Sequence, residues 1–450
     1  MTASKTVFEL FLNASSNAGK RPALVHPQLV LTYEDLATSV LGFAQSLVRH
    51  GVEPGTKVAL VSRALTTNLN MVLAVSAIGG TFVHAASSDP SSAPPTDLTF
   101  FSREPGITVP ATGIEIDGDW IAATGGLPSA KALATHPALV GQAADGSYIE
   151  ISPTDLAARA NAFLFGTPSP LHWASTLAPT QLAFLERALA CLISGGTIVT
   201  TTDPDFWMRA RATMVTGNSG ALSALLSSTP ASSLQMADLI DEVLDVELAS
   251  LLGKVPTVRQ VYSPLAVGPA LVRLTRESGH DTRVVAARVD IVDQTFQPVA
   301  VGQVGAVRIE TADGKKVLPG DVGYLTSAGD LILVAHSRDN AIIGGLPINL
   351  RAVEAEMTAI EGIRSAVAFR NPKQFAPDEI FAYLVLEEGF NASQLKELAR
   401  NRVGKKFGSS TAPRVIQTIA EVPRGPDGST DRVACAALIL KLAANRRAEA

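Results

Sequence analysis

The 450-residue sequence is poor in cysteine, in aromatic residues and in long apolar runs. Its two cysteines, Cys191 and Cys435, lie far apart in apolar contexts, which predicts buried thiols in a reducing compartment and excludes a disulfide framework or a cysteine metal site. The apolar stretches 71–83 and 189–199 are broken by Gly-Gly, well short of the roughly 18–20 residues that a bilayer span needs. No membrane span is therefore expected.

An excess of basic charge is also absent. The 37 Lys and Arg against 42 Asp and Glu give a net charge of -5, and no basic stripe interleaved with aromatics occurs, so no nucleic-acid partner is expected. Residues 1–15 carry Glu9 inside their only apolar run, which argues against a secretory signal and for a cytoplasmic location. The last 50 residues are locally basic, and either an anionic ligand or a solvated helical surface accounts for that.

Strand-like and helix-like segments alternate along most of the chain, a pattern that predicts an α/β protein of two or three domains. A capping-box sequence at 32–35 precedes apolar residues at helical spacing, and a buried-type strand follows at 58–62. Segment 87–137 is rich in Ser, Pro and Gly and predicts irregular connections around minor strands. Closely spaced strands after Thr282 predict a small antiparallel sheet or barrel, and a compact α+β unit follows from about Asn340.

One stretch of the sequence points to a particular protein family. GDVGYLTSAGDLILVAHSRDNAIIGGLPINLRAVEAEM, residues 320–357, resembles without gaps a long motif of the adenylate-forming superfamily, which includes acyl-CoA synthetases, peptide-synthetase adenylation domains and luciferase. Further similar pieces occur in the family's order, among them VRQVYSPLAVGP at 258–269 and VPRGPDGSTDR at 422–432. The resemblance covers nearly the whole chain, with apparent deletions around 87–135 and 283–320.

The resemblance implies a fold of two domains. Residues 1–338 would form a large domain of α/β sheets plus a small barrel-like β region, and residues 339–450 a small, mobile α+β domain. In the family the large domain binds ATP and a carboxylic acid, and the small domain swings about a hinge to serve first adenylate formation and then thiol transfer.

Several site positions of the family have a counterpart in this sequence. Asp321 matches the aspartate that accepts hydrogen bonds from the ribose hydroxyls, and Tyr262 falls in a second nucleotide-binding motif. Asp339 matches the hinge, and Gly344 and Gly345 match the loop that lines the thiol tunnel. A purely structural use is open at these positions too, since an Asp in a Gly-Asp-Val-Gly turn and a Gly-Gly pair also serve tight turns.

The groups that handle the triphosphate differ from the family pattern. The clamp position, residues 141–146, has neither a lysine nor a hydroxyl-rich run, so it predicts a β-turn on Asp145-Gly146, the alternative being a small anion nest. Leu265 and Ala266 stand where the family has its phosphate-binding threonine and its Mg²⁺-holding glutamate. His336 replaces an arginine, and Ser429 replaces the catalytic lysine.

Two more motifs differ. The aromatic-His motif near the carboxylate pocket appears as Ala178-Pro179-Thr180-Gln181, and the glycine-rich adenine loop is expected to be replaced by DLIDEVLD, residues 238–245. Losing one charge-stabilising group typically costs about 10²–10³ in rate. The clamp, the Mg²⁺-holding glutamate, the arginine and the lysine all differ, so ordinary ATP-dependent adenylation is not expected. ATP and Mg²⁺ are not expected as cofactors, and no metal site is expected.

Three hypotheses about function remain open. The first is a protein that binds a carboxylic acid, a CoA or phosphopantetheine thioester, or an acyl-adenylate and carries out acyl transfer or condensation. The second is an inactive pseudoenzyme that regulates or scaffolds a carrier protein or a paralogous enzyme. The third is an acid–thiol ligase with relocated cations at Lys405, Lys406 or Arg424. No spacing singles out a nucleophile, and the candidate catalytic groups are His336, Ser429 and Tyr262, with His172 as a further polar group.

Overall fold

A computed structural model represents the whole chain. The residues whose structure is described are 5–84, 95–104, 110, 112–122, 136–142, 148–179, 181–201, 203–217, 222, 225–226, 233–240, 255–276, 278–284, 288–293, 296–311, 314–335, 339–343, 346–370, 379–424, 430–432 and 434–439.

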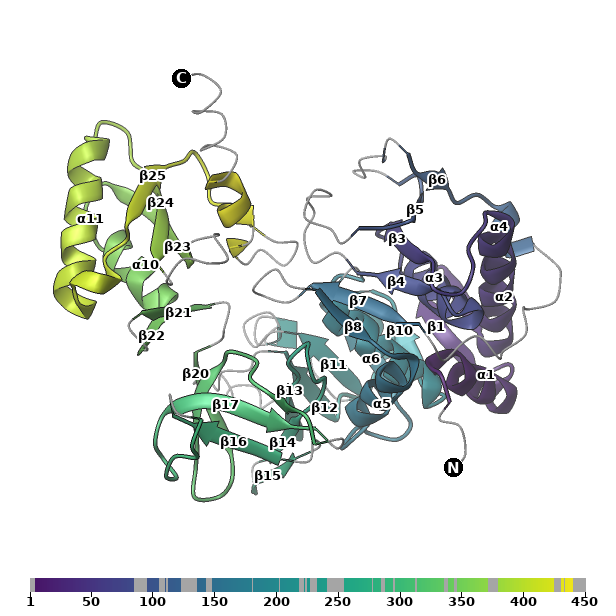
Figure 1. Ribbon diagram of the computed structural model, residues 1–450. Helices are drawn as coiled ribbons and strands as arrows, with labels where there is room; N and C mark the ends of the chain where they lie inside the picture. Colours follow the sequence, from purple (N-terminus) through teal and green to yellow (C-terminus); the bar gives the residue numbers. More distant parts are fainter. Residues whose placement is uncertain are drawn as a thin grey trace.

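The largest sheet has nine strands in the order β15-β14-β13-β12-β11-β9-β10-β1-β2 (Figure 1). Its six inner strands from β13 to β1 run parallel, and β2, β14 and β15 are antiparallel to their neighbours. Every residue of β13 is buried, as expected for a strand covered on both faces. The strands are β1 Pro22–His26, β2 Leu29–Thr32, β9 His172–Ser175, β10 Thr197–Val199, β11 Met214–Gly217, β12 Met236–Leu239, β13 Thr257–Tyr262, β14 Leu271–Arg276 and β15 Gly279–Val284.

A second sheet has six strands in the order β6-β5-β3-β4-β7-β8, all parallel except the pair β7–β8. Strand β5 lies inside this sheet, between β3 and β6, and has a buried Phe100. It is therefore a core strand, although its Ser- and Pro-rich flanks predicted only a minor one. The strands are β3 Lys57–Val61, β4 Thr81–Val83, β5 Leu98–Phe101, β6 Ile114–Glu115, β7 Leu139–Gln142 and β8 Tyr148–Ile151.

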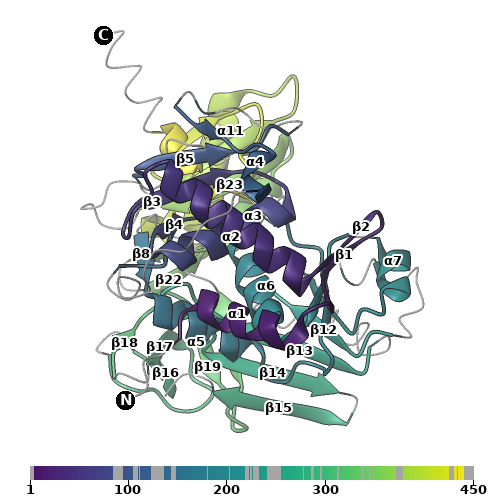
Figure 2. The same ribbon diagram turned by 90° about the vertical axis from the view of Figure 1, so that its right-hand side faces the viewer.

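Helices fill the space between these two sheets, as Figure 2 shows for α1, α2 and α3. Helix α6 packs on β9 and β10, α3 packs on β3 and β4, and α1 contacts α2, α3, α5 and α6, so one hydrophobic core runs through both layers. The capping box predicted at 32–35 is present, with Thr32 and Asp35 bonded reciprocally at the start of α2. The helices are α1 Val7–Ala18, α2 Tyr33–Arg49, α3 Leu65–Ile78, α4 Asp119–Ala122, α5 Pro153–Phe163, α6 Leu182–Ile193 and α7 Pro204–Arg209.

The predicted small β region is a five-stranded antiparallel sheet with the path β16-β17-β19-β20 and β18 paired to β17. Its core includes Tyr262 from β13 and Leu271 from β14, so the small sheet packs against the end of these two strands. Its strands are β16 Arg288–Val292, β17 Gly305–Glu310, β18 Lys316–Val317, β19 Val322–Leu325 and β20 Leu331–Ala335.

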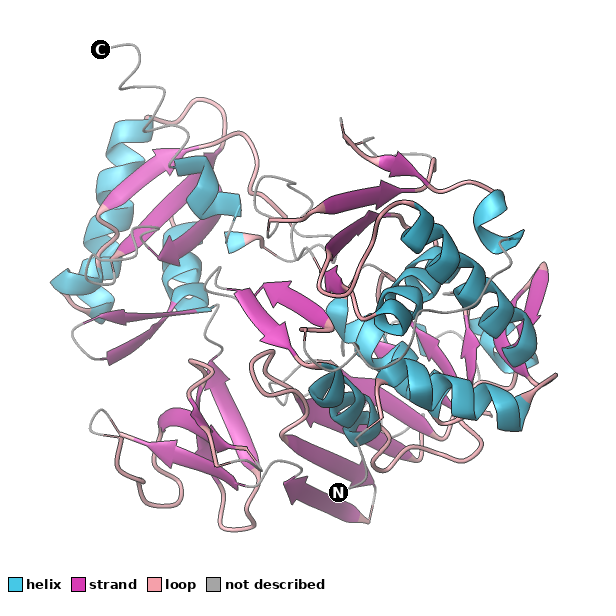
Figure 3. Cartoon of the chain, turned by 45° about the vertical axis from the view of Figure 1, so that its right-hand side comes forward, coloured by secondary structure: helices cyan, strands magenta, loops and turns pink. Residues whose placement is uncertain are grey.

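The C-terminal α+β unit forms a separate lobe beside the other sheets (Figure 3). It has a hairpin, a sheet in the order β23-β24-β25, and two hydrophobic clusters that contain only residues after 340. The domain boundary between 338 and 339 and the mobility of this unit stay predictions. Its elements are β21 Asn340–Ile343, β22 Leu346–Asn349, α10 Leu350–Thr358, β23 Ile363–Arg370, β24 Ile380–Leu386, α11 Ala392–Phe407, the 3₁₀ turn Ser409–Thr411 and β25 Val415–Thr418.

Both cysteines are free and buried, which confirms the prediction from sequence. Burial raises the pKa of the Cys191 thiol, and it raises that of Cys435 to about 12, so neither is a reactive thiolate near neutral pH. Among the described helices, none has the length and apolar character that a membrane crossing requires. The cytoplasmic location stays a prediction.

Candidate functional site

Two predicted nucleotide-binding residues meet where β13 ends. The Tyr262 hydroxyl donates a hydrogen bond of 2.6 Å to Oδ2 of Asp321, and both side chains are buried. Parallel β9, β11, β12 and β13 all end at this edge of the large sheet, which is where ligands bind in open α/β sheets. The structure thus joins two residues that are 59 positions apart in the sequence, while their role in binding a nucleotide stays a prediction.

The turn before β19 places the Asp321 carboxylate. Gly320 has a φ of 90°, a left-handed conformation that glycine adopts without strain. The Asp321 carbonyl then accepts a hydrogen bond of 2.9 Å from the Val307 amide, which ties the turn to β17. The small antiparallel sheet therefore holds the carboxylate against the end of the large one.

Two of the predicted site motifs, the clamp position and the segment after Tyr262, meet at an apolar contact beside the start of α6. Gly141, in β7 at the start of the clamp position, faces Leu265 from the loop after β13 and Leu182 from the first turn of α6. A Cβ atom on Gly141 would lie 3.1 Å from Leu265 Cδ1 and 3.6 Å from Leu182 Cδ2. The side chains at the meeting point are aliphatic, and the role of these segments in nucleotide binding stays a prediction.

A buried cation supports the same loop. Arg159 of α5 donates a hydrogen bond of 2.7 Å from Nη1 to the Leu265 carbonyl, and the same nitrogen lies 3.7 Å from Oε1 of Glu186 in α6. Burial lowers the pKa of Arg159 and raises the pKa of Glu186, each opposed by the attraction between the two charges. Nothing in the family's motifs points to this pair.

Two uncharged polar groups flank the apolar contact. Ser263 Oγ, next to Tyr262, and Gln181 Oε1, at the start of α6, are both buried and have no hydrogen-bond partner among the described residues. A buried polar atom without a partner costs about 1–3 kcal/mol. The site therefore contains hydrogen-bonding groups that a bound ligand could satisfy.

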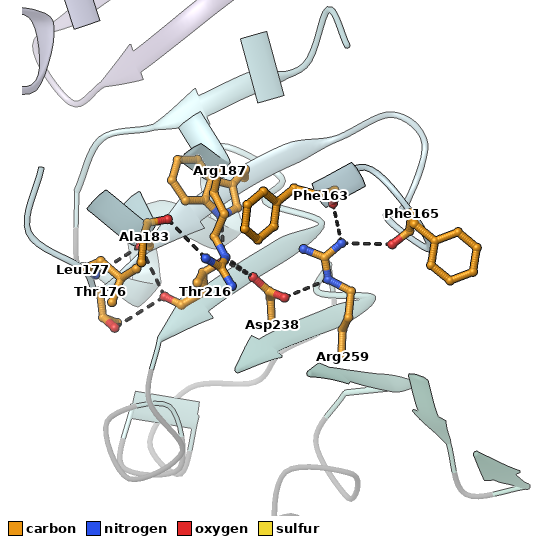
Figure 4. A network of polar contacts seen from close by, with 11 residues as sticks. Phe163, Phe165, Thr176, Leu177, Ala183, Arg187, Thr216, Asp238 and Arg259 are labelled. Atoms are coloured by element: carbon orange, nitrogen blue, oxygen red, sulfur yellow. Dashed lines mark hydrogen bonds and ion pairs between the residues drawn. The ribbon is translucent and has the colours of Figure 1, made fainter. Parts of the chain in front are cut away.

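A buried ionic network lies between the large sheet and helices α5 and α6 (Figure 4). This network, here named the Asp238 network, consists of Arg187, Thr216, Asp238 and Arg259. Oδ2 of Asp238 accepts from Arg187 Nε at 2.6 Å and from Thr216 Oγ1 at 3.0 Å, and Oδ1 accepts from Arg259 Nε at 2.7 Å. Arg259 also donates from Nη1 to the Phe163 carbonyl at 2.6 Å, which ties β13 to the end of α5.

The Asp238 network corrects the predicted adenine loop. Asp238 and Leu239 belong to strand β12, so the segment 238–245 begins inside the sheet, and its residues 241–245 lie outside the described residues. Burial would raise the pKa of Asp238, but the two guanidinium groups and their hydrogen bonds outweigh it and lower the pKa to about 2. Asp238 is thus a structural carboxylate.

The predicted hinge residue is held by arginines of the C-terminal unit. Asp339 is buried. Its Oδ1 accepts a hydrogen bond of 3.0 Å from Arg432 Nη2, and its Oδ2 lies 3.0 Å from Arg351 Nε. Arg432 also donates to the Ala368 carbonyl at 2.6 Å and to Glu354 of α10. We name these four side chains, Asp339, Arg351, Glu354 and Arg432, the hinge cluster. Arg432 is therefore a buried structural cation, which corrects the reading of the basic C-terminus as a solvated surface at this position.

Several predicted positions lie outside the described residues: His336, Gly344, Gly345, Ser429 and most of the clamp position, residues 143–146. Their roles stay predictions. His172 is described at the start of β9, at the edge opposite Tyr262, where its Nδ1 is buried without a partner in the described structure. Within the described residues no group of three or more His, Cys, Asp and Glu side chains could hold a metal ion.

Comparison with solved structures identifies the architecture. The amide bond synthetase McbA from Marinactinospora thermotolerans matches with a TM-score of 0.66 and 19% identity, over 96% of this chain and 100% of that one. O-succinylbenzoate coenzyme A synthetase from Bacillus subtilis, solved with ATP and a magnesium ion, matches with a TM-score of 0.68 and 16% identity, over 96% and 99%. The chain has the adenylate-forming fold. The resemblance predicted from the sequence is thereby confirmed, and at this identity the structural likeness establishes the fold alone.

Curated relatives of the adenylate-forming kind also match in sequence. Sulfoacetate–CoA ligase of Cupriavidus necator is 26% identical over 35% of this chain and 34% of its own length. A linear gramicidin synthase of Brevibacillus parabrevis is 22% identical over 97% of this chain and 10% of its own length. The chain thus spans about a third or less of the length of these relatives. No protein-family model matches the chain.

Reasoning from the family's motifs missed Arg159, Glu186 and the Asp238 network. A signal was present, because Asp238 interrupts an otherwise apolar strand and Glu186-Arg187 interrupts an apolar helix. Charged residues are almost never fully buried unless they are paired. Charges within apolar runs of the adenylate-forming fold therefore predict buried ion pairs, but the sequence does not say which charges pair.

Proposed function

We propose that this chain is an acyl-CoA synthetase-like protein that binds an acyl group as its adenylate or as a CoA or phosphopantetheine thioester, and transfers or condenses it without making the adenylate from ATP. In such a step an acceptor nucleophile bonds to the acyl carbon, and the bond to the AMP phosphate oxygen or the thiol sulfur breaks. AMP or the thiol leaves, and the acceptor's proton passes to the leaving group or to solvent.

The observation that carries this proposal is the hydrogen bond between Tyr262 and Asp321. It supports the proposal because Asp321, which resembles the family's ribose-binding aspartate, lies with a tyrosine at the edge where ligands bind in open α/β sheets. A carboxylate suits the vicinal diol of a ribose, since it offers two acceptor oxygens. An acyl-adenylate, whose ribose keeps both hydroxyl groups, therefore fits the residues that are present.

The absence of adenylate synthesis is proposed on the chemistry of the neighbouring loop. Mg²⁺ takes oxygen ligands, but Leu265 and Ala266 offer none from their side chains at the family's metal and phosphate positions. Leu265 instead packs toward Gly141 and Leu182, an aliphatic contact where a triphosphate would need donors and positive charge. The residues present thus do not fit Mg²⁺-ATP.

A divergent acid–thiol ligase is the second candidate, because several curated relatives are named as CoA ligases. It would need a relocated cation to balance the charge of the leaving pyrophosphate. Among the proposed replacements, Lys406 pairs with Glu356, so its ammonium group already has a carboxylate partner within the C-terminal unit. A regulatory or scaffold protein without chemistry is the third candidate.

The first prediction separates these candidates by pyrophosphate exchange. Wild-type protein with Mg²⁺-ATP, labelled pyrophosphate and a panel of carboxylic acids is expected to show no acid-dependent exchange. The same protein is expected to bind acetyl-CoA or an acyl-AMP in native mass spectrometry. Asp321→Ala should weaken acyl-AMP binding about tenfold, whereas the exposed control Glu388→Ala should leave it unchanged.

Exchange with any acid would establish the ligase and overturn the proposal. Binding of neither acyl-AMP nor acyl-CoA, together with a co-purifying protein partner, would favour the scaffold instead. The outcomes are distinct because exchange reports on ATP chemistry, and mass spectrometry reports on occupancy.

A further inference from the structure

Arg159 brings a positive charge to the loop where the family has its metal ligand. Its side chain is 7% exposed and leaves α5 toward the loop after β13, where Nη1 bonds the Leu265 carbonyl at 2.7 Å. Leu265 is one residue before Ala266, the position of the missing glutamate. The cation is therefore within the candidate site, although no motif of the family marks it.

The guanidinium group of Arg159 is incompletely satisfied. Its Nε is buried and has no hydrogen-bond partner among the described residues. The nearest carboxylate oxygen, Oε1 of Glu186, lies 3.7 Å from Nη1, which is too far for a hydrogen bond. An arginine presents a planar fork of five N–H donors, so a buried arginine with an open Nε lacks a planar acceptor.

The other buried arginines of this layer are different. Arg187 and Arg259 each bond an Asp238 oxygen directly, at 2.6 and 2.7 Å. Their charges are paired within the protein, although Nη2 of Arg259 is, like Nε of Arg159, buried without a partner in the described structure. Arg159 bonds the uncharged Leu265 carbonyl, and its printed carboxylate contact is the longer one to Glu186, so its charge is less completely paired than theirs.

The loop is built around the Arg159 side chain. Gly268 has a φ of 82°, and a Cβ atom there would lie 2.5 Å from Arg159 Cγ. The backbone thus passes directly over the arginine stem, and any larger residue would displace it. Arg159 and the loop that follows Tyr262 consequently form one rigid piece, which fixes the guanidinium group near the end of β13.

From this geometry we infer that Arg159 is the anion-binding residue of the candidate site, and that its guanidinium group binds either the phosphate of an adenylate or the carboxylate of an acyl ligand. The inference rests on the proposed function, and it gives the site a fixed cation in place of Mg²⁺. A tetrahedral phosphate and a planar carboxylate each offer two oxygens that can accept a bidentate pair of hydrogen bonds from an arginine fork. Arg159 is placed here as a binding residue, with no proton transfer assigned to it.

Calorimetric titrations with AMP, adenosine and benzoate test this inference. If Arg159 binds a phosphate, Arg159→Met should lower the affinity for AMP about tenfold to a hundredfold. The affinity for adenosine should stay unchanged, because only AMP carries the anion. If Arg159 binds a carboxylate, Arg159→Met should lower the affinity for benzoate by a similar factor. The ratio of the AMP affinity to the adenosine affinity should then stay as in the wild type. A purely structural role would change AMP and adenosine alike.

Arg187→Met is the matched control, since it removes a buried arginine from the same layer and leaves Asp238 paired to Arg259. Arg159→Lys keeps the charge and is expected to bind with intermediate affinity, so it serves if the methionine variant does not fold. If the Arg159 variants bind AMP and benzoate as tightly as the wild type does, and the wild type binds acetyl-CoA, the inference is overturned and the proposed function is not. Failure of the wild type to bind any of these probes would overturn the proposed function itself, and the inference with it.

Discussion

At the scale of single residues, the candidate site contains some buried polar atoms that have hydrogen-bond partners and some that have none in the described structure. Tyr262 and Asp321 satisfy one another, whereas Ser263 and Gln181 leave an oxygen without a partner in the described structure. Such unpaired atoms are costly, and in proteins they concentrate where a ligand completes the hydrogen bonding. The contrast between neighbouring Tyr262 and Ser263 is consistent with the proposed ligand site beside β13.

Removing one oxygen from Tyr262 tests this picture. Tyr262→Phe should lower the free energy of unfolding by about 1–2 kcal/mol, because a buried oxygen of Asp321 loses a donor while the ring keeps its packing. Chemical denaturation of the purified variant measures the effect. Tyr148→Phe is the control, since Tyr148 is exposed in β8 and its change should stay within about 0.5 kcal/mol. Equal stability of the two variants would show that the buried hydrogen bond contributes nothing.

At the scale of elements, the Asp238 network ties β11, β12 and β13 to α6 and to the end of α5. One member of the network, Arg259, lies in β13, three residues before Tyr262. The strand is thereby fixed on its helix-facing side by ion pairs and on its other side by the core of the small sheet. This arrangement positions the end of β13 from both faces.

A pH dependence follows from the Asp238 network. The pKa of Asp238 is lowered from its ordinary value near 3.8 to about 2, so its stabilising effect is complete above the ordinary value and is lost as the pH falls toward 2. The loss should amount to about 2–3 kcal/mol. Unfolding of the wild type and of Asp238→Asn at pH values from 7 to 2.5 measures it.

The two proteins should differ by about 3–5 kcal/mol at pH 7, because the variant leaves two buried arginines without a carboxylate. The difference should narrow as Asp238 of the wild type becomes protonated. A constant difference over the whole pH range would contradict the assignment. If Asp238→Asn does not fold, the triple variant Asp238→Leu, Arg187→Met and Arg259→Met should restore folding, since replacing a whole buried ion cluster by apolar residues is often neutral.

At the scale of the whole molecule, the hinge cluster decides which part of the chain carries the predicted hinge residue. Asp339 is bonded to Arg432 and paired with Arg351, both from the C-terminal unit. If the unit moves, the carboxylate is therefore expected to move with it, and the rotation would fall in the residues before it. The separate hydrophobic clusters of the unit are consistent with independent folding.

Arg432→Met should destabilise the C-terminal unit selectively. The change leaves the buried Asp339 and the partly buried Glu354 carboxylates with one cation fewer, a loss of about 3–5 kcal/mol. Hydrogen exchange measured by mass spectrometry should show faster exchange in β23 and β24 and unchanged exchange in β12 and β13. Arg402→Met removes an exposed partner of Glu356 and is the control that should change little. Faster exchange in both domains would mean that the chain unfolds as one cooperative unit.

The sequence by itself determined the fold class, because the alternation of apolar segments and the gapless motif at 320–357 depend on local periodicity and short-range spacing. It also paired Asp321 and Tyr262 as residues of one site, by their resemblance to the family. Only the tertiary structure decided that Tyr262 bonds Asp321, that Leu265 packs toward Gly141, that β5 is a core strand, and that Arg159 and Arg432 are buried. The physical reason is distance along the chain, since these contacts join residues tens to more than a hundred positions apart, and a side chain's partners depend on which strands become neighbours in the sheet.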